Sequence, residues 1–173
     1  MIESNSADFE LLNEVIGPQT AQWSAMYRAF ADMDAEQIKE KGKPHLAPEL
    51  ERFSEEVRER MIVFKTNPHM YRALAEELEE MPQCAKKLKQ YGGFSPIPLL
   101  VIGRDPEHSI QTMIRQGMPE QQAGKIEAVW QDLIKSQLKL STTSQYVMAE
   151  RSGHGVYVDN PAVIINAITS FVM

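Results

Sequence analysis

The sequence has one cysteine, Cys84, so no internal disulfide bond can form. A single cysteine fits a reducing compartment. A nucleophilic role for Cys84 would need an activating base close to it in space, and no motif around the residue indicates one. We therefore expect Cys84 to be a small residue within a short helix.

Long apolar runs and basic clusters are also missing. The longest uninterrupted apolar segments, "IPLLVI" and "AVII", are far too short to span a bilayer. The N-terminus has early acidic residues and no targeting pattern, which predicts a cytoplasmic protein without membrane contacts. The formal charge is −6, the pI is near 5.3, and the densest basic stretch is "KKLKQ" at 86–90. Nucleic acid is therefore not an expected partner.

Metal and phosphate motifs are absent as well. The four histidines, His45, His69, His108 and His154, lack the spacing that places two ligands on one helix face. Glycine-rich phosphate loops do not occur, because "GGFSP" has neither the lysine nor the following helix. We expect no metal ion and no cofactor.

Residues 1–91 have the pattern of successive helices. Apolar residues follow helical spacing in three segments, 18–33, 47–64 and 67–81, and the stretches "KGKPHLAP" and "MPQ" are the expected breaks between them. Asn67 and Pro68 form a strong helix start. The aromatic and methionine-rich face of 18–33 suits either a helix core or an apolar substrate pocket, and core is the simpler interpretation.

Residues 92–173 have a different pattern, with the expected boundary at Gly92 and Gly93. The run "IPLLVIG" is typical of a strand buried on both faces, and "SQYVMAE" indicates a second strand after a long helical segment. Asn160 and Pro161 predict the start of a last helix. The order strand, helix, strand, helix predicts an α/β fold with a parallel βαβα unit.

Two parallel strands do not make a stable sheet by themselves. We expect both strands to expose an unpaired edge, which another copy of this chain, a complementing polypeptide or a segment outside this sequence would cover. The sequence therefore predicts a homo-oligomer or a two-chain assembly.

The second half resembles the C-terminal portion of the α/β-hydrolase superfamily. The resemblance rests on "PLLVIGRDP" and on "AERSGHGVYVDNPAVIINAI" at residues 149–168, which is similar to the last strand, the histidine turn and the last helix of that family. It implies that 92–173 is the C-terminal part of an incomplete hydrolase sheet. Residues 1–91 then look like the helical cap, or lid, that such enzymes carry.

By that resemblance His154 is a general base and Asp105 is the acid that orients its imidazole. Glu107 is a neighbouring alternative for the acid, and Glu150 is a weaker one. The implied reaction is hydrolysis of a small ester- or amide-like substrate by a serine nucleophile.

The serine itself is missing from the pattern. The family carries it on a Gly-x-Ser-x-Gly turn, and no such motif occurs in this sequence. Ser95 is followed by Pro96 and no helix opens there, and Ser152 lies on the histidine's own turn, where a structural role is expected. We expect the chain to be inactive alone.

Two functions remain open. The first is the cap and histidine half of a serine hydrolase, which acts on its substrate when the missing half completes it. The second is a non-catalytic binding module that oligomerises through its open sheet edge. A helical regulatory protein without hydrolase ancestry leaves "PLLVIGRD" and "SGHGVYVDNP" unexplained.

Overall fold

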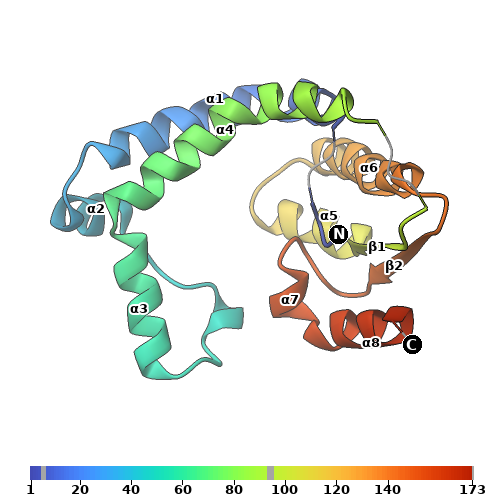
Figure 1. Cartoon of the computed structure of the whole chain (residues 1–173). Coiled ribbons are helices and arrows are strands. Elements are labelled where there is room, and N and C mark those ends of the chain that lie inside the picture. Colours follow the sequence, from blue (N-terminus) through green and yellow to red (C-terminus); the bar gives the residue numbers. More distant parts are fainter. Residues whose placement is uncertain (5–6, 93–95, 173) are drawn as a thin grey trace. The chain divides into compact units, whose positions relative to one another are not determined.

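A computed structural model describes residues 1–4, 7–92 and 96–172 (Figure 1). The chain is mostly helical with a small parallel sheet, which confirms the mixed α/β class. It forms two compact units: unit 1 comprises Met1–Ile16 and Gln83–Met173, and unit 2 comprises Gly17–Pro82. This division differs from the expected regions 1–91 and 92–173, because the first residues and residues 83–91 belong with the strands.

The first half of the chain is helical, and both strands lie in the second half. In chain order they are α1 (Phe9–Ala31), α2 (Ala35–Gly42), η1 (Pro48–Leu50), α3 (Glu55–Lys65), α4 (Pro68–Lys89), β1 (Leu99–Arg104), α5 (Pro106–Arg115), α6 (Glu120–Ser136), η2 (Gln137–Leu140), β2 (Ser144–Ala149), α7 (Val156–Asp159) and α8 (Pro161–Val172). Within the described residues, no helix combines the length and apolar character needed to cross a membrane.

The sheet of unit 1 pairs β1 with β2 in parallel, in a register that runs from Leu99 opposite Ser144 to Arg104 opposite Ala149. The start of the chain pairs with the other edge of β1, where Ile2 forms a parallel bridge with Ile102. The expectation that both strands expose an unpaired edge was therefore wrong for β1. For β2, the described residues supply no strand on its outer edge.

Helices cover both faces of this sheet, with α6 on one side and α8 on the other (Figure 1). On the α8 side Ile102, Ala149 and Val156 form a buried cluster against Val163 and Ile164. On the α6 side the strands and helix approach closely at Gly103. A Cβ at this position would lie 2.7 Å from the Tyr146 Oη and 3.1 Å from the Ile134 Cγ2. Glycine is needed here to keep β1 in contact with α6.

The long helices depart from the expected boundaries. The stretch "MPQ" was expected to end a helix, but α4 continues through Pro82 to Lys89, and α1 likewise contains Pro18. A proline inside a helix removes one backbone hydrogen bond. In α4 the fully buried Ala75 precedes Pro82 and the buried Ala85 follows it. Packing before and after the proline therefore supports the continuous helix.

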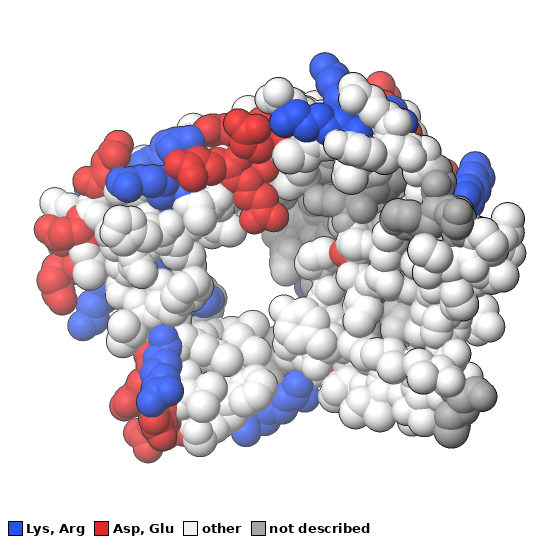
Figure 2. Space-filling model, viewed as in Figure 1, with Lys and Arg blue, Asp and Glu red and all other residues white. Residues whose placement is uncertain are grey.

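In unit 2 the aromatic face of α1 packs in part against α4. The Phe30 and Tyr71 rings lie 4.9 Å apart, whereas Trp23 remains 42% exposed. Arg28 donates to both Glu79 carboxylate oxygens, at 3.1 and 2.5 Å. On the face shown in Figure 2, basic and acidic side chains alternate over the helices of this unit.

Candidate functional site

The candidate site lies in unit 1, at the edge of the sheet where β1 and β2 both end. Arg104 and Ala149 are neighbours in the last register position, so the loops that follow the two strands begin side by side. The Asp105 N–H donates to the Ser152 carbonyl at 3.0 Å and ties these loops together. In open α/β sheets, ligands bind beyond the carboxyl ends of the strands.

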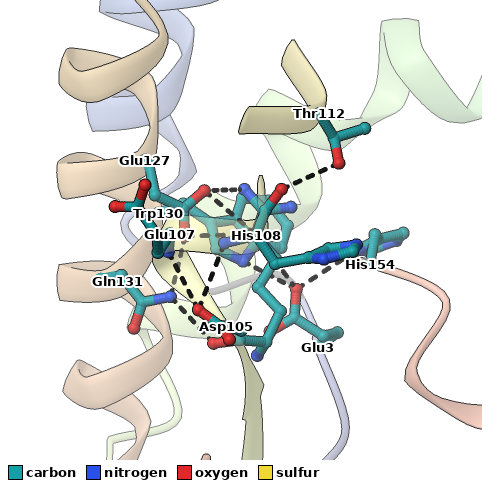
Figure 3. A network of polar contacts seen from close by, with 10 residues as sticks. Glu3, Asp105, Glu107, His108, Thr112, Glu127, Trp130, Gln131 and His154 are labelled. Carbon is teal, nitrogen blue, oxygen red and sulfur yellow. Dashed lines mark hydrogen bonds and ion pairs between the residues drawn. The ribbon is translucent and has the colours of Figure 1, made fainter. Parts of the chain in front are cut away.

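His154 lies on the loop between β2 and α7, and its side chain is 67% exposed. The Nδ1 atom lies 3.5 Å from the Glu3 Oε2, and the Trp130 ring stands nearly perpendicular to the imidazole, with 5.5 Å between ring centroids (Figure 3). One ring nitrogen therefore faces a carboxylate, while the ring as a whole is open to solvent.

Behind His154 lies a buried cluster of charged groups from three segments. Glu3 comes from the start of the chain, Arg104 from the end of β1 and Glu127 from α6. The Arg104 Nε and Nη2 donate to the Glu127 Oε2 at 3.1 and 2.5 Å, and the guanidinium lies 4.6 Å above the Trp130 ring. Gln131 donates to Glu127 at 2.8 Å, so the buried carboxylate of Glu127 has three N–H donors.

Asp105 serves as the N-cap of α5. Its Oδ1 accepts from the backbone N–H groups of Glu107 at 3.0 Å and His108 at 3.2 Å, and its Oδ2 accepts from the Arg151 N–H at 2.9 Å. These bonds, led by that of Arg151, hold the pKa of the Asp105 carboxyl below its usual value. Within residues 1–4, 7–92 and 96–172, no hydrogen bond or ion pair joins Asp105 to His154.

Within the described residues, neither of the other candidate acids forms an ion pair with His154. Glu107 is exposed on the first turn of α5 and accepts from the Gln111 amide at 3.0 Å. The side chain of Glu150 is exposed at the end of β2. The structure therefore brings His154 together with Glu3, a residue that the sequence patterns did not single out.

Of the candidate nucleophiles, Ser152 and Cys84 lie in the described part of the chain. Ser152 is fully buried, and its hydroxyl donates to the Glu150 carbonyl at 3.2 Å, which fits the expected structural role. Ser95 lies outside the described residues. Cys84 is exposed on α4. Across the described part of the chain, no three His, Cys, Asp or Glu side chains are placed to hold a metal ion.

Comparison of the chain with models of protein families, with curated proteins and with solved structures finds no match.

Proposed function

We propose that His154 is the general base of an α/β-hydrolase-type active site that hydrolyses a small ester- or amide-like substrate. The observation that carries the proposal is the position of His154: an accessible imidazole beyond the carboxyl end of a parallel strand, with a buried carboxylate 3.5 Å from Nδ1. A carboxylate at one ring nitrogen leaves the other nitrogen free to take a proton from a hydroxyl group.

The nucleophile comes from a polypeptide segment outside this sequence. No Gly-x-Ser-x-Gly turn occurs in the chain, and Ser152, the serine closest to His154 in sequence, is buried. In the proposed reaction the incoming hydroxyl attacks the substrate carbonyl carbon as its proton passes to His154. The imidazolium then gives that proton to the leaving group.

The test is the reaction of the purified chain with p-nitrophenyl acetate, an activated ester that imidazole attacks without other catalytic groups. We expect His154→Gln to lower the second-order rate severalfold because it removes the activated imidazole. His69→Gln is the matched control, since His69 is an exposed histidine in unit 2, and we expect it to change the rate little. We also expect that a fluorophosphonate labels none of these proteins, the wild type or the two variants.

A second function, a non-catalytic oligomerising module, is favoured by the surface of α7 and α8. Tyr157 is 70% exposed, Ile165 63% and Val172 77%, and α8 contains no charged residue. Exposed apolar patches of this kind mark interaction surfaces. An unchanged ester rate in His154→Gln, together with a defined dimer in light scattering, would favour this function over hydrolysis.

A further inference from the structure

We propose that Glu3 is the positioning residue for His154: its carboxylate fixes the proton on Nδ1 and holds the ring in place. This inference rests on the proposed function, because positioning matters only if His154 transfers a proton. Under this proposal Glu3, which lies 151 positions before the histidine in sequence, takes the orienting role that the family resemblance implies for Asp105.

The Glu3 carboxylate is held rigidly. Its side chain is 2% exposed, its Oε1 accepts from the Arg104 backbone N–H at 2.6 Å, and its Oε2 accepts from the Trp130 Nε1 at 2.9 Å. The oxygen bound by Trp130 is the same one that lies 3.5 Å from the His154 Nδ1 (Figure 3). A carboxylate fixed by two donors can orient an imidazole at little further entropic cost.

Trp130 connects the two partners. Its indole N–H donates to Glu3, and its ring meets the His154 imidazole edge to face. One side chain of α6 thus sets the direction of the carboxylate and also supports the ring that the carboxylate faces. Such shared contacts are typical of groups that position a functional side chain.

The buried cluster next to His154 contains more carboxylates than cations. Arg104 makes its short hydrogen bonds to Glu127 and lies 3.8 Å from the Glu3 Oε2. One guanidinium therefore faces two buried carboxylates, and His154 approaches Glu3 as the second positive group when it is protonated. Among the other charged groups near this turn, Arg151 and Glu150 are exposed at the surface, and Asp159 accepts from the Gly153 N–H at 2.7 Å.

The backbone places Glu3 at this position. The Ile102 N–H donates to the Met1 carbonyl at 2.8 Å, and the Glu3 N–H donates to the Ile102 carbonyl at 3.0 Å. Glu3 itself has a φ of +44°, in the left-handed region that non-glycine residues seldom adopt. Backbone strain of this kind persists where the surroundings fix a side chain, and it is concentrated at functional sites.

The competing carboxylates are already engaged. Both Asp105 oxygens accept from backbone N–H groups, Glu107 accepts from Gln111, and Asp159 accepts from Gly153. Glu3 is the only carboxylate that the described residues bring within 4 Å of a His154 ring nitrogen.

The test is the ring tautomer of neutral His154, measured by ¹⁵N NMR on the full chain. Free histidine favours the proton on Nε2, whereas a carboxylate at Nδ1 favours the proton on Nδ1. We expect the Nδ1–H form to predominate in the wild type, to be lost as the major form in Glu3→Gln, and to be retained in part in Glu3→Asp. His69 is the internal reference, and its tautomer stays the same in all three proteins.

If Glu3→Gln does not fold, the wild-type measurement alone decides the question, because a predominant Nε2–H form at His154 overturns the proposal. An unchanged tautomer in folded Glu3→Gln overturns it as well and leaves Glu3 with a purely structural role. Neither readout depends on ester hydrolysis. A Glu3-dependent tautomer combined with a normal ester rate in His154→Gln would thus support the pairing while rejecting the proposed function.

Discussion

Replacing Arg104 by methionine is expected to destabilise unit 1 by about 3–5 kcal/mol, because it leaves buried carboxylates without their cation. The Arg104 side chain is 12% exposed and those of Glu3 and Glu127 are each 2% exposed. Methionine fills a similar volume, so the cost comes mainly from uncompensated charge. Urea unfolding followed by circular dichroism at neutral pH measures the change in free energy of unfolding.

The matched control is Arg60→Met on α3. Arg60 also pairs with a glutamate, Glu56, at 2.7 Å, but the two side chains are 78% and 73% exposed. Water solvates such a pair in the folded protein, so its loss changes stability little. Equal effects of the two substitutions would show that the Arg104 cluster is not buried as described.

The second large effect is expected for Asp105→Ala, at about 2 kcal/mol of lost stability. This substitution removes the N-cap of α5 and the acceptor of the Arg151 N–H that ties the two loops together. If Asp105 acts as a cap and a tie, the ester rate of folded Asp105→Asn stays close to that of the wild type. A normal stability with a reduced rate would instead support the role of orienting acid.

The same substitution has a definite pH dependence. The pKa of Asp105 is lowered in the folded protein, first of all by the Arg151 N–H, from an ordinary value of 3.8. The charged carboxylate therefore stabilises the fold above about pH 4, and this contribution is lost as the pH falls through the lower folded-state pKa. The stability difference between wild type and Asp105→Ala should shrink below pH 4, as urea unfolding at several pH values would show.

The strands and their parallel pairing could be predicted because their signals are local. The run from Leu99 to Gly103 is apolar on both faces and follows a proline, which is typical of a strand covered by helices on either side. The His154 turn follows the second strand directly. In both cases the residues that carry the signal are next to each other in the chain.

The role of Asp105 at the start of α5 could also have been predicted from sequence. Asp105 precedes Pro106, the same pairing of a capping residue and a first-turn proline that marked Asn67 and Pro68 as a helix start. In the structure the Asn67 Oδ1 accepts from the His69 N–H at 2.9 Å, and Asp105 makes the equivalent bonds. The family resemblance instead implies that Asp105 is an orienting acid, a role that this local rule does not require.

Glu3 had no such signal. Its partners, Arg104, Trp130 and His154, are between 101 and 151 residues away in sequence, and no spacing rule links positions this far apart. The pairing of the first residues with β1, in which Ile2 forms a bridge with Ile102, brings Glu3 to the site, and this contact depends on the tertiary fold.

If the Glu3 carboxylate holds the His154 imidazole in its reactive orientation, the two residues act as one unit. The most direct measurement compares the p-nitrophenyl acetate rates of Glu3→Gln, His154→Gln and the double variant. If the two residues act together, each single substitution removes most of the enhanced rate and the double variant loses nothing further. If the rate losses of the two single variants multiply in the double variant, or if Glu3→Gln keeps the wild-type rate, Glu3 and His154 do not act together.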